Sequence, residues 1–316
     1  MKKIIAIFLL SVSLFGANIQ KPIAQYMSSG AVIDLLYNKG KLYSATNASS
    51  VDIFDITTKK IIKKIEVDKI KDFTGEVIDS KIYSVDLLKD KILILSQAKK
   101  GYRRLHIHEN NETKLIIPYT DKLYIAKAKF LDENTLLLAL LSNEIISYDI
   151  KNKKFNWKIQ VSMSKFSNFA LNEKKDEVVI ADESGDLHVI KTKDGSNIKT
   201  YAGQNLDNIF QVDYKNGIIA TAGQDRRLVI YNTKLKSSYY KLASFLIYSV
   251  GLSPSGKIVA YASDEQNNVT VFKTGTKTVL GKFTGNKMTL SNIVFINEKE
   301  FFVACDDKTI NLYKIK

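Results

Sequence analysis

Few residues of this chain belong to types that build metal or redox sites. The histidines are His106, His108 and His188, and the single cysteine is Cys305. His106 and His108 lie two residues apart, so on a β-strand both would point to one face and could ligate a metal. A tetrahedral zinc ion would need further ligands that the sequence pattern does not indicate. We therefore interpret both histidines as structural or surface residues and predict no metal site.

Other catalytic patterns are also missing from the sequence. Cys305 follows the apolar run 301–304, which predicts a buried thiol, and one cysteine can form neither an internal disulfide nor a C-x-x-C-H haem site. The chain has no Ser-His-Asp order, no glycine-rich phosphate loop and no H-E-x-x-H motif. We predict no catalytic residue, no cofactor and no enzymatic activity.

A six-residue pattern recurs along the chain. It consists of an apolar residue, any residue, an apolar residue, an aromatic residue or its replacement, any residue, and then Ile or Thr. The fourth position of each copy is Phe54, Tyr148, Ile190, Tyr231, Phe272 and Tyr313, and the last four spacings are 42, 41, 41 and 41 residues. The long gap after Phe54 contains a further copy at 105–108, which makes seven. A period near 41 with four short strands per unit is typical of β-propellers. We predict an all-β, seven-bladed WD40-like propeller over residues 18–316.

The two ends of the repeat region predict how the ring closes. The last unit ends three residues after Tyr313 and therefore lacks an outer strand. The segment 22–27 lies before the first strand of unit one, at 31–36, and is free to supply the missing strand. Pairing the first segment with the last unit closes the ring and protects its edges.

The N-terminus has the organisation of a secretory signal. Lys2 and Lys3 precede an apolar run at 4–15, and the small residues Gly16 and Ala17 follow it. About a dozen apolar residues are too few to span a membrane. We predict a signal peptide at 1–17, no membrane anchor after cleavage, and a periplasmic location.

The chain is basic, with a formal net charge of +14. Lys2 and Lys3 contribute two of these charges and leave with the signal peptide. The remaining lysines are scattered through predicted loops and do not alternate with aromatic residues, as stacking on single-stranded nucleic acid would require. We therefore interpret them as a solvated surface and predict no binding to nucleic acid.

The four arginines occur as two pairs that occupy the same register, each directly before a leucine and the predicted third strand of units two and five. Propeller topology would place both pairs on loops of one face, on opposite sides of the central channel. The guanidinium fork suits carboxylate or phosphate groups of a partner. A solvated turn that tolerates any charge is the alternative. The candidate partner-binding face consists of Lys99, Lys100, Arg103, Arg104, Arg226 and Arg227.

One loop matches a modification signal. Glu109-Asn110-Asn111-Glu112-Thr113 resembles the acidic sequon of bacterial periplasmic N-glycosylation, and Asn111 would be its acceptor. An unmodified polar turn is the alternative.

Two stretches resemble known repeats. Residues 217–232 (GIIATAGQDRRLVIYN) are similar to the second and third strands of a WD40 repeat, including its turn aspartate, and 304–313 (ACDDKTINLY) are similar too. The Gly-His pair and the Trp-Asp ending of that family are absent. At the scale of the whole chain, the signal together with blades carrying 51–55, 91–98 and 141–150 resembles the WD40-type NapL accessory proteins encoded beside periplasmic nitrate reductase.

That resemblance implies an auxiliary role in maturing or supporting the reductase, with no catalytic residue to transfer. We therefore predict a non-catalytic periplasmic scaffold whose partners are proteins, nitrate reductase components among them. The alternative is a propeller enzyme or small-ligand-binding protein, lactonase-like or quinoprotein-like, with a central polar pocket. The single tryptophan, Trp157, argues against a quinoprotein, because such propellers repeat a tryptophan docking motif.

Overall fold

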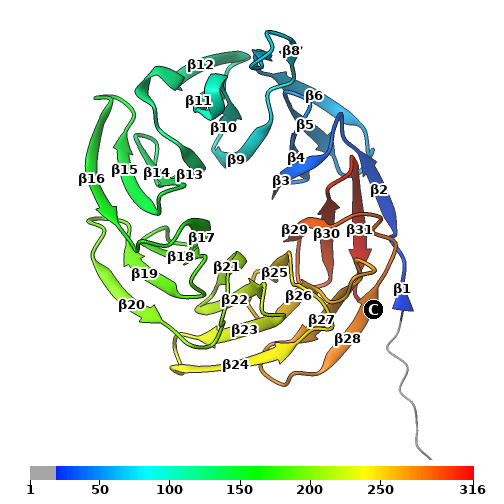
Figure 1. The fold of residues 1–316 in the computed structure, drawn as a ribbon. Helices are drawn as coiled ribbons and strands as arrows, with labels where there is room; N and C mark the ends of the chain where they lie inside the picture. Colours follow the sequence, from blue (N-terminus) through cyan, green and yellow to red (C-terminus); the bar gives the residue numbers. More distant parts are fainter. Residues whose placement is uncertain (1–18) are drawn as a thin grey trace, which may run out of the picture.

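The computed structural model describes residues 19–316, in which apolar runs broken by Asn, Asp, Gly and Lys form short β-strands. The predicted signal peptide at 1–17 lies outside these described residues. Seven sheets, each built on four antiparallel strands, surround a central axis (Figure 1). The chain is a seven-bladed β-propeller, which confirms the predicted fold class.

Each blade has an inner, a second, a third and an outer strand, counted from the axis outward. The inner strands are β3 (Val32–Asn38), β9 (Ile82–Leu88), β13 (Ile125–Phe130), β17 (Phe166–Leu171), β21 (Ile209–Lys215), β25 (Val250–Leu252) and β29 (Leu290–Phe295). The second strands are β4 (Lys41–Thr46), β10 (Lys91–Gln97), β14 (Thr135–Leu140), β18 (Glu177–Asp182), β22 (Ile218–Gly223), β26 (Ile258–Ala262) and β30 (Glu300–Cys305).

The outer half of each blade follows the same order. The third strands are β5 (Ser50–Asp55), β11 (Arg103–Glu109), β15 (Glu144–Asp149), β19 (Leu187–Lys191), β23 (Arg227–Asn232), β27 (Val269–Lys273) and β31 (Thr309–Lys314). The outer strands are β6 (Ile61–Glu66), β12 (Glu112–Ile117), β16 (Lys154–Gln160), β20 (Asn197–Tyr201), β24 (Ser237–Leu242), β28 (Val279–Phe283) and, for blade 7, β2 (Ala24–Met27). The short elements are β1 (Ile19–Gln20), β7 (Ile70–Lys71), β8 (Val77–Ile78), and the 3-10 turns η1 (Lys99–Gly101) and η2 (Tyr119–Asp121).

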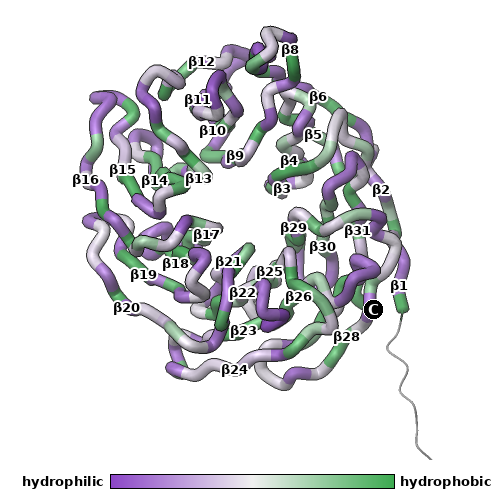
Figure 2. The backbone as a smooth tube through the Cα atoms, in the orientation of Figure 1, coloured by the Kyte–Doolittle hydropathy of each residue, from purple (hydrophilic) through white to green (hydrophobic). Residues whose placement is uncertain are grey.

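Hydrophobicity decides which strands lie inside the ring. The second strands carry near-continuous apolar runs and are buried on both faces, as in β14, whose last five residues are all buried. The outer strands alternate and leave one face to solvent, as in β16. Figure 2 shows this order, with hydrophobic segments within the blades and hydrophilic ones mainly in turns. Apolar burial between neighbouring blades therefore holds the ring together.

The outer strands carry at least one lysine in each of blades 1 to 6. These residues are Lys63, Lys64, Lys114, Lys154, Lys158, Lys199, Lys241 and Lys282. In blades 1 to 5 the outer strand is the free edge of its sheet, and a charged side chain there discourages pairing with another chain. Part of the basic composition is thus explained by edge protection, in agreement with a solvated lysine surface.

The ring closes as the sequence predicts. β2 pairs antiparallel with β31, from Ala24 opposite Leu312 to Met27 opposite Thr309, and so supplies the outer strand of blade 7. A further pairing was not predicted: β1 adds to β28 of blade 6 in parallel orientation. The N-terminal segment therefore joins two blades.

The chain passes from each blade to the next at one end of the ring, which we call the crossover face. The turns between second and third strands lie on the same face, because successive strands run antiparallel. The crossover into blade 2, at 67–81, contains the extra β7–β8 hairpin. This insertion explains the long repeat spacing after Phe54. Residues 19–316 contain no helix with the length and hydrophobicity needed to cross a membrane.

Candidate functional site

The structure places both arginine pairs at the crossover face of blades 2 and 5, which lie across the ring from each other (Figure 1). One detail of the sequence interpretation is wrong. Arg103 and Arg104 begin β11, and Arg227 begins β23, so only Arg226 lies in a turn. The strands start earlier because Arg103 and Arg104 continue the ladder with β10, opposite Gln97 and Ser96.

The second arginine of each pair fastens a loop. Arg104 Nη2 donates to the carbonyl of Asp68 at 2.6 Å, and Arg227 Nη1 donates to the carbonyl of Gln204 at 2.7 Å. Asp68 and Gln204 lie in the crossovers that lead into the same two blades. The shared register of the two pairs therefore has a shared structural role.

Aromatic rings pack against the guanidinium groups of two of the arginines. The guanidinium of Arg103 lies 3.9 Å from the ring centre of Tyr83, and that of Arg227 lies 4.4 Å from the ring centre of Tyr240. Arg226 is exposed, as are Lys99 and Lys100. Those three residues remain free to meet an anionic partner, and partner binding by the candidate face stays a prediction.

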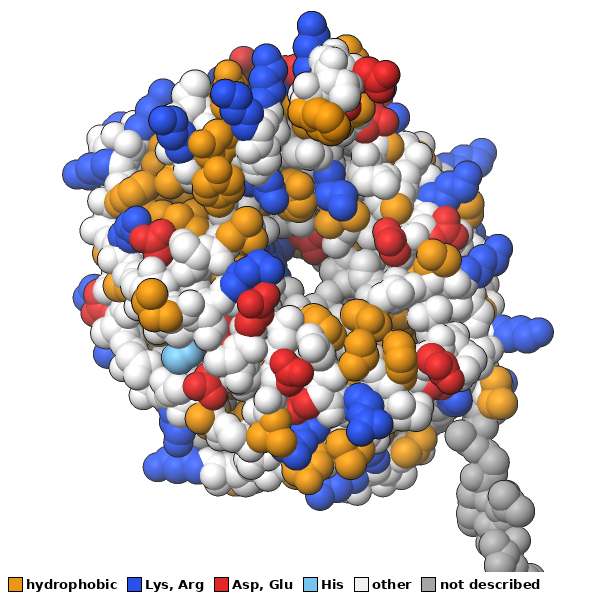
Figure 3. All heavy atoms as spheres, viewed as in Figure 1, with side chains coloured by type: hydrophobic (Ala, Val, Ile, Leu, Met, Phe, Trp, Pro, Cys, Tyr) orange, Lys and Arg blue, Asp and Glu red, His pale blue; other side chains and the backbone are white. Residues whose placement is uncertain are grey.

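The sequence interpretation missed a set of exposed apolar side chains on the crossover face. Phe73 is 101% exposed, Met163 95% and Leu206 63%, whereas most large apolar side chains are buried. All six crossovers between blades 1 and 7 present at least one such residue. We call this set the apolar rim; it consists of Phe73, Tyr119, Tyr124, Met163, Leu206, Phe245 and Met288. Figure 3 shows hydrophobic side chains at the surface of several blades around the central opening.

Hydrogen bonds fix the loops that carry the rim. The buried carboxylate of Asp182 accepts bonds from three loop residues, Asn143, Ser162 and Ser184. Ser162 directly precedes Met163, so this contact fixes the loop of that rim residue. In blade 5 the Asp225 carboxylate accepts from the backbone N–H of Leu206 at 2.7 Å. A fixed loop loses less conformational entropy on binding, which favours recognition.

Aromatic stacking supports the rim at two places. Tyr124 packs against Tyr102 with ring centres 4.8 Å apart. Phe245 lies beside Tyr248, which in turn stacks on Phe210 with ring centres 5.2 Å apart and planes at 16°. These contacts make the rim a set of positioned side chains.

A sequence signal for the rim exists. Met163 stands between two serines, Leu206 between Asn205 and Asp207, and Phe73 between an aspartate and a threonine. A single apolar loop residue that lies between two polar residues in the sequence fits neither the alternation of a strand nor the apolar run of a core segment. The pattern holds at Phe73, Met163, Leu206 and Met288, in four of the six crossovers.

The histidines act in packing. His108 contacts Lys63 Nζ through Nε2 at 2.9 Å and Thr113 through Nδ1 at 2.8 Å, so both ring nitrogens are engaged. His106 is buried, and its Nε2 lies 3.4 Å from Ser96 Oγ. Within residues 19–316, no three His, Cys, Asp or Glu side chains cluster as metal ligands would.

His188 and Asp182 bring a histidine, an aspartate and serines together, but in an order unsuited to nucleophilic catalysis. His188 Nε2 lies 3.6 Å from Asp182 Oδ2, and the serines bond to the aspartate instead of the imidazole. A triad needs the imidazole between carboxylate and hydroxyl. This cluster therefore fixes loops.

Burial of His106 predicts an acid-sensitive fold. Burial lowers the pKa of His106 from 6.5 to about 4, and the Arg104 charge adds to the effect. The folded state keeps the neutral imidazole, so its stability contribution is complete above pH 6.5 and decreases as the pH falls from 6.5 to 4. We expect a loss of roughly 3 kcal/mol over this range from this one group. Urea unfolding from pH 7 to 4 measures it.

The matched variants for this prediction are His106→Gln and His188→Gln. His106→Gln should show a flatter pH dependence than wild type, because its side chain cannot be protonated. His188→Gln, in another blade, controls for removal of an imidazole. Parallel curves for wild type and His106→Gln would contradict the prediction.

Asn111 occupies the exposed turn between β11 and β12 at φ +63°. Its Oδ1 accepts a hydrogen bond from Lys63 Nζ at 2.7 Å. The turn is exposed, as the sequon hypothesis requires, and glycosylation of Asn111 stays a prediction. The predicted buried thiol, Cys305, is buried and free.

Comparison with known proteins leaves the propeller without an assigned family. No protein-family model matches the chain, and no curated protein matches its sequence.

Proposed function

We propose that the protein is a non-catalytic scaffold that binds a partner protein through its crossover face. The observation that carries this proposal is the apolar rim, with an exposed apolar or aromatic side chain in all six crossovers between blades 1 and 7. Binding energy in protein interfaces is concentrated in a few such side chains. A rigid ring that presents them on one face can engage a broad surface without any chemistry.

The charge of the chain indicates the kind of partner. The formal net charge is +14, and Arg226, Lys99 and Lys100 are exposed at the crossover face beside the rim. Complementary charges steer association and favour a partner with an acidic surface. Together with the resemblance to NapL-type proteins and the predicted signal peptide, this supports a component of periplasmic nitrate reductase as the partner.

The proposal is tested by capture from a periplasmic extract of the source organism, using the mature chain as bait. We expect wild type to recover nitrate reductase subunits, identified by mass spectrometry. The variant Phe73→Ser/Met163→Ser/Leu206→Ser should recover at least ten-fold less, because three exposed contacts are lost together. These side chains are largely solvent-exposed, so the variant should fold normally.

A control variant replaces three exposed apolar residues elsewhere. Ile62, Ile198 and Leu235 lie on outer strands or on the opposite face, and their change to serine should leave capture unchanged. Equal recovery by the rim variant would overturn the binding face. Absence of reductase subunits from the wild-type capture would overturn the proposed partner.

A further inference from the structure

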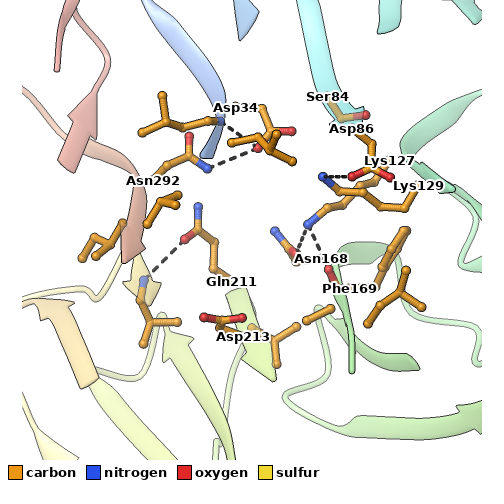
Figure 4. A pocket seen from close by; sticks show the side chains of 18 of the residues that line it. Asp34, Ser84, Asp86, Lys127, Lys129, Asn168, Phe169, Gln211, Asp213 and Asn292 are labelled. Carbon is orange, nitrogen blue, oxygen red and sulfur yellow. Dashed lines mark hydrogen bonds and ion pairs between the residues drawn. The ribbon is translucent and has the colours of Figure 1, made fainter. Parts of the chain in front are cut away.

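A cavity of about 720 Å³ lies on the axis of the ring and is lined by the inner strands (Figure 4). This volume is within the range of small-molecule sites, roughly 300–1,000 Å³. The wall combines apolar side chains such as Phe169 and Ile293 with lysine, aspartate and amide groups. A cavity of this composition has the means to orient a polar ligand.

Most of the charged groups on the wall fasten one blade to the next. Three aspartates accept the backbone N–H of the following inner strand. The pairs are Asp34 with Val85 at 2.9 Å, Asp86 with Phe130 at 2.8 Å, and Asp213 with Leu252 at 2.8 Å. Lys129 lies 3.5 Å from Asp86 Oδ1 and donates to the carbonyl of Val85. The charges of Asp86 and Lys129 thus neutralise each other.

Lys127 differs from Lys129 in the partners of its ammonium group. Its Nζ donates to Asn168 Oδ1 at 2.8 Å and to the carbonyl of Phe169 at 2.9 Å, and it forms no ion pair with a carboxylate of residues 19–316. An ammonium group has three donors, so one remains for a ligand. Burial, helped by the charge of Lys129, lowers the pKa of Lys127 to about 8 against the opposing effect of nearby aspartates. Among the described residues, the Lys127 charge therefore has no carboxylate within ion-pair distance.

Acceptors without a full complement of partners occupy other parts of the wall. Asp34 makes no ion pair among the described residues, and the nearest cation to Asp213 is Lys215, at 3.9 Å. Asn292 Oδ1 is buried without a hydrogen-bond partner in the described protein. Figure 4 shows Asn292 across the cavity from Lys127, with Asp34 and Asp213 on the walls between them.

We propose that the central cavity binds a small zwitterion with one carboxylate and one ammonium group, of the amino acid or short peptide class. The ligand carboxylate would meet Lys127 Nζ and the Nδ2 group of Asn168. The ligand ammonium would meet the carboxylate of Asp213, which lines the same cavity.

The charges of the wall select against simpler ligands. A ligand with only a carboxylate would satisfy Lys127 but would bring a like charge towards Asp34 and Asp213, which repel it. A ligand with only an ammonium would face Lys127. A zwitterion satisfies both sets of groups, and the apolar residues of the wall can accommodate its side chains.

Isothermal titration calorimetry with three related peptides tests the proposal. Alanyl-leucine carries both charges, N-acetyl-alanyl-leucine keeps the carboxylate alone, and alanyl-leucine amide keeps the ammonium alone. We expect wild type to bind alanyl-leucine at least ten-fold more tightly than either of the blocked peptides.

Two variants assign the binding to the cavity. Lys127→Met should weaken alanyl-leucine binding at least ten-fold. Because Lys127 also bonds to blade 4, Asp213→Asn is the second variant; its amide oxygen can still accept the Leu252 N–H, so the blade contact is kept, and binding should again weaken. Lys165→Met, which removes a surface lysine paired with Glu183, should bind like wild type.

No binding of alanyl-leucine by wild type, equal binding of a blocked peptide, or unchanged affinity in folded Lys127→Met and Asp213→Asn would each overturn the zwitterion site. None of these outcomes affects the scaffold proposal, which depends on the crossover face.

Discussion

Removal of residues 19–27 is expected to destabilise the whole ring. The deletion takes away β2, the outer strand of blade 7, and β1, which pairs with blade 6. Tyr26 is 1% exposed, packs edge-on against Phe54 and Phe302 with ring centres 5.7 and 5.4 Å away, and donates to the carbonyl of Ile56. Tyr26 thus joins blade 7 to blade 1. Without it, the two ends of the ring lose their shared core.

The single substitution Tyr26→Ala isolates the packing part of this effect. Replacing a large buried aromatic residue by alanine costs about 3–5 kcal/mol, which is a large share of the stability of a typical protein. Thermal unfolding should shift down by at least about 5 °C. Met27→Ala, on the same strand but half exposed, should melt close to wild type. An unchanged melting temperature of the deletion would contradict closure by this strand.

The repeat arithmetic was sufficient to predict the fold because each copy of the pattern marks a third strand. The markers Phe54 and Tyr231 are buried in the cores between blades, where the spacing of one blade to the next is fixed. Ring closure was predictable for a related reason. The N-terminal segment contains a strand that belongs to no complete repeat, and the last repeat lacks its outer strand. β1 was not predictable, since two residues carry no periodicity.

The crossover face could be predicted only in part. The register of the arginine pairs was visible in the sequence, but their contacts with Asp68 and Gln204 depend on how the loops fold back over the blades. The rim was missed because surface apolar residues taken singly carry no information. Their meaning comes from their recurrence in all six crossovers, which the folded ring brings to one face. The cavity was anticipated only as an alternative, because its wall groups come from separate blades and meet only in the folded ring.

Asp182→Ala is expected to be among the most destabilising substitutions at the crossover face. The Asp182 side chain is fully buried and accepts bonds from three loops, through Asn143 in blade 3, Ser162 in the crossover, and Ser184 in blade 4. Alanine removes all of these hydrogen bonds and leaves the buried Asn143 amide with its bond to Ser162 Oγ alone. A hydrogen bond to a charged group contributes about 1.5–3 kcal/mol, so we expect a total loss of about 3–5 kcal/mol, measured by urea unfolding.

The ionisation of Asp182 adds a pH test to the same site. Burial opposes its charge, but the nearby His188 imidazole and hydrogen bonds from Ser162 and Ser184 lower the pKa of Asp182 far below its usual value. The stability it contributes is complete above the unfolded pKa, about 3.9, and is lost as the pH falls below it. Wild type should therefore lose more stability than Asp182→Ala between pH 5 and 3.

Partner capture by Asp182→Ala tests whether Asp182 holds the rim loop in its binding conformation or only stabilises the protein. At a temperature where Asp182→Ala remains folded, its partner capture should fall, because the loop of Met163 is no longer fixed. Asp194→Ala removes a carboxylate from an exposed turn, where it accepts the N–H of Ser196, and should change neither stability nor capture. Full capture by folded Asp182→Ala would mean that the rim binds without a fixed loop, and the entropic argument for a rigid platform would fail.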